Sequence, residues 1–171
     1  MTIKYKKIEK GETEDKEIIL TNGYKITCGD ENTIYRENEN TIYRYNKNTI
    51  TCANGNKIHC YRDNKVDCWN NNKIDCGDEN EIHCYNNNKI YCWNNNKVDC
   101  GDENEIHCYN NNKIYCWNNN KVDCENKNSI TAGKGTKVTA WYNNESFYYE
   151  FKNDGRKTIY FENGIFEEMD R

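Results

Sequence analysis

Residues 69–92 read WNNNKIDCGDENEIHCYNNNKIYC, and residues 93–116 repeat them except that Val98 replaces Ile74. Each of these units consists of three octads, and each octad reads N-x-[IV]-x-C followed by three turn-like residues. The octads continue on both sides of this stretch, over residues 45–140. A fixed period that is shorter than any domain indicates a repeat architecture.

The octads place three residue types in columns. Cysteines recur every eight residues, with an aliphatic residue two places before each of them and an asparagine two places before nearly every aliphatic residue. The last two octads carry Ala132 and Ala140 in the cysteine column, which indicates that the column needs small residues. The residues predicted to form a structural core ladder are Cys52, Cys60, Cys68, Cys76, Cys84, Cys92, Cys100, Cys108, Cys116, Cys124, Ile58, Ile74, Ile82, Ile90, Ile106 and Ile114.

The octad is typical of a strand with a turn rather than of a helix. Eight is not a multiple of 3.6, so an apolar stripe would drift around a helix. In an extended chain, the first, third and fifth positions face one side, and the polar second and fourth positions face water. Burial of one aliphatic side chain contributes about 2–3 kcal/mol, against about 1–2 kcal/mol of backbone entropy per residue. Stability must therefore come from contacts between stacked neighbours.

The number of octads per coil decides the geometry. Three octads would give a triangular helix and would align Trp69, Trp93, Trp117 and Trp141, but Ile and Cys would leave voids in such a prism. One octad per coil leaves almost no interior. Two octads give facing sheets about 10 Å apart, which Ile and Cys can fill. We predict an all-β parallel solenoid, a two-sheet roll with two octads per 16-residue coil, with three octads or one octad as alternatives.

We expect covers at both ends of the solenoid. The predicted organisation is an N-terminal capping segment at residues 1–23, the octad-repeat solenoid at residues 24–140 and an antiparallel hairpin cap at residues 141–171. At the N-terminal end, TIKYKKIE and KEIIL can pair with each other as strands. In the tail, Asp154-Gly155 and Asn163-Gly164 are dipeptides that favour tight hairpin turns. Such caps protect the backbone and apolar surface of terminal coils.

Composition and charge exclude several partners. Hydrophobic residues make up 35% of the chain, and 32 residues are asparagine. Such polarity is typical of disorder, yet the strict period favours a folded repeat. The 24 basic and 28 acidic residues are interleaved, so the chain has no positive electrostatic field that would attract nucleic acid or anionic lipid. We see no signal peptide or membrane span and expect a cytoplasmic protein with reduced thiols. Association with proteins or with itself stays open.

The run NNNKIYCWNNNKVDCGDENEIHC is similar to the N-x-V-x-G/S repeats of grass-type ice-binding β-rolls, with cysteine where that family has a small residue. The likeness covers about residues 24–140 and concerns the fold. It implies a two-sheet roll with inward asparagine and aliphatic ladders. The family binds ice through a flat face of small outward residues, Thr and Ser among them. The outward pairs here, such as Lys73 with Asp75 and Glu81 with His83, do not match that face.

The cysteine column has three readings. A zinc site needs tetrahedral closure by closely spaced ligands, which single thiols in line do not offer. Disulfides between adjacent coils are near the allowed Cα separation, but parallel Cβ vectors would strain them. We therefore predict that the cysteines from Cys60 to Cys116 are buried, small apolar thiols rather than disulfides, and we expect no metal or cofactor.

Two further sets of residues are candidates for binding. His59, His83 and His107 are 24 residues apart and would align only in coils of three octads, so we expect outward, solvated side chains. Aromatic residues at sixth positions either form a stacking platform for sugars or bases or shield the turn backbone. The members of this candidate stacking surface are Trp69, Tyr85, Trp93, Tyr109 and Trp117.

Arg36 and Arg44 break the rule of the cysteine column. Their octads keep Asn and Ile, so the register has not slipped, and a buried unpaired guanidinium would cost several kcal/mol. Either the side chains reach water at the open edge, or they pair with carboxylates such as Glu31, Glu37 or Glu39. The two arginines are thus a candidate anion or salt-bridge site.

No Ser/His/Asp set, phosphate-binding loop or pocket with paired carboxylates is recognisable in this sequence. The pattern predicts a rigid, non-catalytic structural or interaction solenoid with an internal cysteine ladder. One alternative is ice binding. The other is a thiol-based metal or redox buffer.

Overall fold

The computed structural model describes residues 4–8, 17–20, 24–28, 33–152 and 155–169, and for residues 4–8, 17–20, 24–28, 36, 44 and 45 it describes the backbone alone. In this part of the chain every regular element is a strand. Sheet A contains β1 (Lys4–Ile8), β3 (Tyr24–Cys28), β5 (Thr41–Asn46), β7 (Lys57–Arg62), β9 (Lys73–Cys76), β11 (Lys89–Cys92), β13 (Glu105–Cys108), β15 (Lys121–Cys124), β17 (Lys137–Tyr142) and β18 (Glu145–Glu150). Sheet B contains β2 (Glu17–Leu20), β4 (Thr33–Arg36), β6 (Thr49–Cys52), β8 (Lys65–Cys68), β10 (Glu81–Cys84), β12 (Lys97–Cys100), β14 (Lys113–Cys116), β16 (Asn128–Ala132), β19 (Lys157–Glu162) and β20 (Ile165–Met169). The described residues contain no helix long and apolar enough to cross a membrane.

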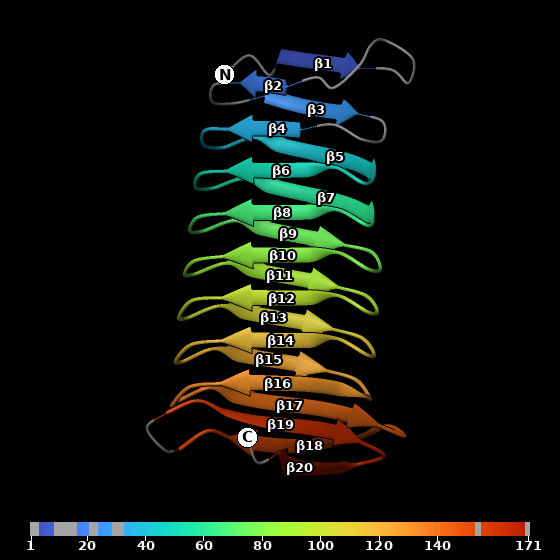
Figure 1. Cartoon of the computed structure of the whole chain (residues 1–171), viewed down its shortest axis with the longest axis vertical. Coiled ribbons are helices and arrows are strands. Elements are labelled where there is room, and N and C mark those ends of the chain that lie inside the picture. The colour runs from blue at the N-terminus through green and yellow to red at the C-terminus, as the bar shows by residue number, and fades with distance from the viewer. Residues whose placement is uncertain (1–3, 9–16, 21–23, 29–32, 153–154, 170–171) are drawn as a thin grey trace.

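Successive octads alternate between the two sheets, so one coil contains two octads. Strand β10 pairs in parallel with β12, and Ile82 lies opposite Val98, 16 residues further along. Figure 1 shows the odd-numbered strands of the solenoid running one way and the even-numbered strands the other. The predicted two-sheet roll of 16 residues per coil is confirmed, and the coils of three octads and of one octad are wrong because they would require other pairing offsets.

The interior follows the three columns of the octad. The aliphatic residues of the described octads, from Ile34 to Val138, are fully buried, and the cysteines from Cys52 to Cys124 are at most 7% exposed. Ala132 and Ala140 take the same inward place with 0% exposure. The first, third and fifth positions of each octad therefore fill the space between the sheets, as the alternation of an extended strand requires.

The two N-terminal strands do not pair with each other, contrary to the expectation from the sequence. β1 pairs in parallel with β3, and β2 pairs in parallel with β4. The two segments lie in opposite sheets and continue the pattern of the coils, so the prediction that they pair with each other is wrong. The side chains of Arg36 and Arg44 lie outside the described part, although the backbone of these residues is in register with Cys52 and Cys60.

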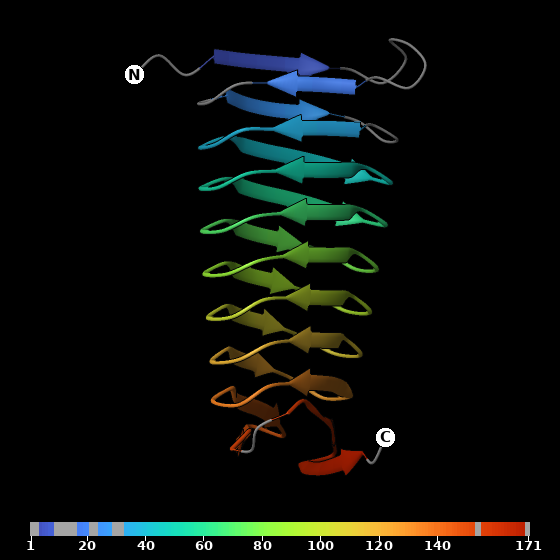
Figure 2. The ribbon, with the colours of Figure 1, turned by 60° about the vertical axis from the view of Figure 1, so that its left-hand side comes forward.

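The C-terminal end is capped by antiparallel strands, as expected. β18 pairs with β17, β19 pairs with β16, and β20 pairs with β19. Figure 2 shows this C-terminal end of the stack from another side. The predicted turn at Asn163-Gly164 joins β19 to β20, but β17 and β18 are joined at Asn143-Asn144, which the sequence reading overlooked. A tight hairpin near Asp154, a residue outside the described part, is wrong because β18 and β19 belong to different sheets.

Candidate functional site

The first column of the octad is a hydrogen-bonded asparagine ladder. From Asn40 to Asn104, each asparagine of this column donates two hydrogen bonds to the amide oxygen of the asparagine one coil later. Asn72, for example, donates its backbone N–H to Oδ1 of Asn88 at 2.9 Å and its Nδ2 to the same atom at 3.2 Å. Nδ2 also donates to a turn carbonyl, that of Asn70. Asn112 donates one such bond to Asn128, and Asn120 donates its backbone N–H to the hydroxyl of Thr136. The twelve buried asparagines from Asn40 to Asn128 thus satisfy the polar groups of the turns from inside.

A second ladder lies in the turns and was missed by the sequence analysis. Seventh-position side chains accept hydrogen bonds from the backbone N–H one coil later, as when Asn94 donates to Oδ1 of Asp78 at 2.8 Å. Eighth-position residues adopt a left-handed conformation, for example Glu79 with φ 59° and Asn87 with φ 57°. Asparagine recurs at both positions because it accepts hydrogen bonds locally and tolerates φ > 0.

The cysteine ladder lies inside the roll as predicted, but one pair is oxidised. Cys60 and Cys76, which face each other in adjacent coils, form a disulfide with Cα atoms 4.7 Å apart. The prediction of thiols alone is therefore wrong for this pair, because coil stacking itself brings two Cα atoms within the range that a disulfide spans. The other cysteines from Cys52 to Cys124 are free and buried. No group of three or more His, Cys, Asp or Glu residues in the described part is arranged to hold a metal ion.

The histidines do not converge on one site. His59 and His107 project from sheet A and lie 3.5 Å from Asp75 and 3.4 Å from Asp123, each in the next coil. His83 projects from sheet B, where its Nε2 lies 3.2 Å from Oε1 of Glu81. The rings of the sheet A histidines also stack on tyrosines of the preceding coil. The histidines therefore belong to separate rows on the two outer faces.

The sixth-position aromatic residues gather along two opposite edges of the roll. Trp69 and Tyr85 stand in adjacent coils at the end of sheet B, with ring centroids 5.9 Å apart. Trp93 and Tyr109 form the same arrangement at the end of sheet A, with centroids 5.5 Å apart. Trp117 follows Tyr85 on the sheet B edge after an interruption at Gly101. The candidate stacking residues are thus exposed, but they are divided between two edges.

A glycine interrupts each aromatic edge and opens a groove. On sheet B, Gly101 stands between Tyr85 and Trp117, and the groove there has a volume of about 640 Å³. A Cβ atom at Gly101 would lie 2.2 Å from Oδ1 of Asn86, so a side chain there would displace Asn86 from its hydrogen bond with the backbone N–H of Asp102. On sheet A, Gly77 stands between Tyr61 and Trp93, where the groove has a volume of about 610 Å³.

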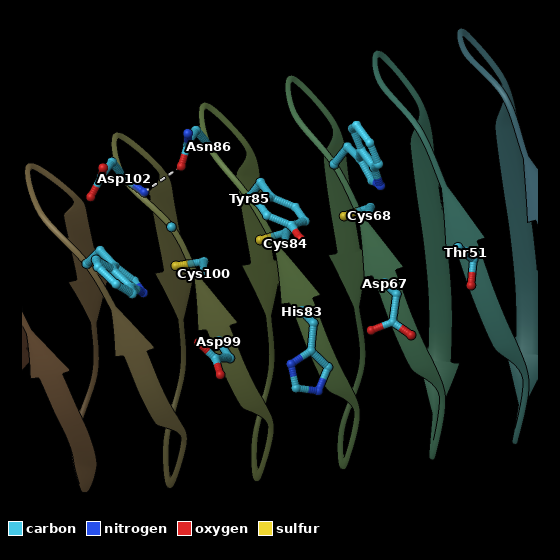
Figure 3. A pocket seen from close by; sticks show the side chains of 13 residues that line it. Thr51, Asp67, Cys68, His83, Cys84, Tyr85, Asn86, Asp99, Cys100 and Asp102 are labelled. Atoms are coloured by element: carbon cyan, nitrogen blue, oxygen red, sulfur yellow. Dashed lines mark hydrogen bonds between the residues drawn. The ribbon is translucent and has the colours of Figure 1, made fainter.

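The two grooves differ in charge. The groove on sheet B is lined by Asp67, Asp99 and Asp102 and by no lysine or arginine (Figure 3). The groove on sheet A is lined by Arg62, which pairs with Glu79. Sequence reading did not find these grooves, although glycine in place of an aromatic residue at the sixth position was a visible signal.

No protein-family model, curated protein or solved structure significantly matches this chain.

Proposed function

We propose that the chain is a rigid, non-catalytic solenoid that serves as a structural or interaction element. The observation that carries this proposal is the continuous asparagine ladder. From Asn40 to Asn104, each asparagine of the ladder is joined to the next coil by two hydrogen bonds to one amide oxygen, in addition to the backbone pairing of both sheets. Shear or bending between coils would break several buried hydrogen bonds at once, and each of them costs about 1–3 kcal/mol when its group is left unsatisfied.

The proposal can be tested by lengthening the rod. Residues 69–116 span three coils, so an inserted second copy keeps every downstream strand in its sheet. Small-angle X-ray scattering should show a maximum dimension increased by about 14 Å, three times the strand spacing, and thermal unfolding should remain a single transition. A matched control inserts twelve of these residues, which do not make whole octads. The control insertion should disrupt the register of the downstream strands, so its thermal unfolding should no longer be a single transition. The rigid solenoid is excluded if the 48-residue insertion fails to lengthen the particle, or if it disrupts unfolding as the control does.

Ice binding is a second candidate, supported by the two-sheet roll with inward asparagine and aliphatic ladders. The outward rows bear charged and aromatic side chains, among them Lys89, Tyr91 and Glu105, so they offer no flat face of small residues. Thermal hysteresis measured on the purified protein tests the ice-binding function. Complete absence of thermal hysteresis excludes ice binding.

A thiol-based redox buffer is a third candidate, supported by the disulfide between Cys60 and Cys76 beside further thiols in the same column. Thiol titration of the native protein and of a denatured sample distinguishes it from a core ladder. The thiols of a redox buffer must react with the titrant in the native state. The thiols of a core ladder react only after the protein is unfolded.

A further inference from the structure

The groove on sheet B runs along the axis of the rod between two rows of side chains. One wall is the fourth-position row, with Asp67, His83 and Asp99. The other wall is the sixth-position row of aromatic residues, interrupted at Gly101. The cysteines between the rows point inward, so strand backbone forms the floor (Figure 3). The groove is therefore open along its length and crosses several coils.

The polar wall carries two carboxylates that form no hydrogen bond or salt bridge. The side chains of Asp67 and Asp99 form neither within the described part of the chain, although Asp99 interacts electrostatically with Lys97. The equivalent carboxylates on sheet A, Asp75 and Asp123, each contact a histidine. The nearby Lys97 is held by Glu81 at 2.8 Å. The lining of the groove on sheet B thus includes carboxylates and no lysine or arginine, although Arg156 contacts the groove at Trp117. This lining complements a cationic ligand and disfavours nucleic acid.

The aromatic wall presents ring faces to solvent. Trp69, Tyr85 and Trp117 are 58%, 63% and 56% exposed. Trp117 already stacks with a guanidinium, since Cζ of Arg156 lies 4.4 Å from its ring centroid. Aromatic faces attract cations and also pack against proline rings, so both walls favour a ligand that combines these groups.

The spacing along the groove fits one backbone conformation. Asp67 and Asp99 are two coils apart, as are Tyr85 and Trp117, and two coils measure about 9.6 Å at the usual strand spacing. A polyproline II helix has three residues per turn and a rise of 3.1 Å, which gives about 9.3 Å per turn. Side chains three residues apart on such a peptide therefore meet equivalent positions in every second coil.

We propose that this groove binds a proline-rich peptide in the polyproline II conformation that carries an arginine or lysine at every third position. The basic side chains contact Asp67 and Asp99, and the proline rings pack in the gap over Gly101 between Tyr85 and Trp117. None of the 171 residues is proline, so the peptide does not come from this stretch of sequence. This inference rests on the proposed function as an interaction element and names the class of its partner.

The test is a titration of the full chain with a synthetic peptide of repeated Arg-Pro-Pro triplets. Binding is monitored by tryptophan fluorescence and by calorimetry. We expect saturable binding that weakens with salt. A Glu-Pro-Pro peptide should not bind. An Arg-Gly-Gly peptide should bind several-fold more weakly, because it must lose more conformational entropy. Absence of saturable binding by the Arg-Pro-Pro peptide overturns the proposal, and equal affinity for the Arg-Gly-Gly peptide overturns the polyproline II conformation.

Variants locate the site. Asp67→Asn with Asp99→Asn should weaken binding about tenfold, since each exposed ion pair contributes up to about 1 kcal/mol. The matched control, Asp75→Asn with Asp123→Asn, changes the same row on sheet A and should leave affinity unchanged. If the asparagine pair folds poorly, Asp67→Thr with Asp99→Thr replaces it, because Thr51 occupies this row. Equal affinities for the sheet B pair and the control assign the peptide elsewhere. If the unaltered chain does not bind the Arg-Pro-Pro peptide but the rod lengthens as expected, the groove proposal alone is rejected. Failure of the lengthening test rejects the rigid solenoid.

Discussion

Asn88 and Asn104, one coil apart, are joined through a single amide oxygen. Oδ1 of Asn104 accepts the backbone N–H of Asn88 at 2.8 Å and Nδ2 of Asn88 at 3.2 Å. Nδ2 of Asn104 in turn donates to the carbonyl of Tyr85 at 2.9 Å. Nδ2 of Asn104 also donates to Oδ1 of Asn120, one coil later, at 3.1 Å. One side chain therefore joins three coils, and a chain with few large apolar side chains can hold its coils in register.

Replacing one member of this ladder should be costly. Asn104→Ala leaves the buried backbone N–H of Asn88 without its acceptor, which costs about 1–3 kcal/mol. The carbonyl of Tyr85 keeps the N–H of Gly101 as its donor. We expect a loss of roughly 1–3 kcal/mol in the free energy of unfolding, measured by urea denaturation. Lys113→Ala, at an exposed position of the same region, serves as the control and should change stability by less than about 0.5 kcal/mol. A loss below about 1 kcal/mol for Asn104→Ala would show that the ladder contributes little.

The left-handed turn residues offer a reciprocal test. Glu103 has φ 58° and Asn111 has φ 59°, and both residues occupy eighth positions. Asparagine adopts this conformation at lower cost than glutamate. Glu103→Asn should therefore stabilise the protein by about 0.5–1 kcal/mol, and Asn111→Glu should destabilise it by a similar amount, as followed by thermal unfolding. Changes of the same sign in the two variants would contradict the backbone explanation.

The cysteines should react in two classes. Because the free cysteines from Cys52 to Cys124 are buried, we expect little alkylation by iodoacetamide in the native state and complete alkylation in urea. Mass spectrometry of the denatured protein without reductant should find two fewer labelled cysteines than with reductant, owing to the bond between Cys60 and Cys76. Rapid native labelling of several cysteines would be incompatible with their inward orientation.

Stability should fall in mildly alkaline solution. Hydrogen bonds with neighbouring thiols, and then burial, raise the pKa of Cys108 and of Cys116 well above the usual value. The native state thus keeps these protons when the unfolded state has lost them, so stability is complete below the unfolded pKa of about 8.5 and decreases as pH rises above it. The expected slope is roughly 1 kcal/mol per pH unit for each such thiol.

Denaturation followed between about pH 8 and pH 9.5, below the usual titration of tyrosine and lysine, measures this slope. Cys108→Ala should reduce the slope by the contribution of one thiol, and Ala132 and Ala140 show that the column accommodates alanine. A slope that stays the same in this variant would assign the pH dependence to other groups.

The fold was predictable because each octad encodes the same inward residues, and the volume of Ile and Cys decided between two and three octads per coil. The turn ladder was not predictable in the same way, since its seventh position holds Asn94, Asp78 and Arg62 and looks like a variable loop. The pairing of the N-terminal strands was misread because local hairpin formation was assumed where the strands extend the two sheets. The disulfide was missed because strain was given more weight than the Cα separation of stacked coils.

The groove on sheet B could not be foreseen from spacing along the chain. Its walls combine Asp67, His83 and Asp99 with Tyr85 and Trp117, which become neighbours through the 16-residue coil alone. The sequence repeats every 24 residues, and this longer period directs attention to alignments, such as that of the histidines, that the coil does not make.

The sequence unit contains three octads, whereas one coil contains two. This mismatch determines how many grooves the rod carries and on which face each groove lies. Each copy of the unit begins on the opposite sheet from the copy before it, so Trp69 and Trp117 stand on one edge and Trp93 on the other. The surface pattern of either face therefore recurs once in three coils, about 14 Å, and alternates between faces. Every further copy of the unit would add one glycine gap on alternate sides, so the number of copies would fix how many partner molecules the rod can hold and in which directions they point.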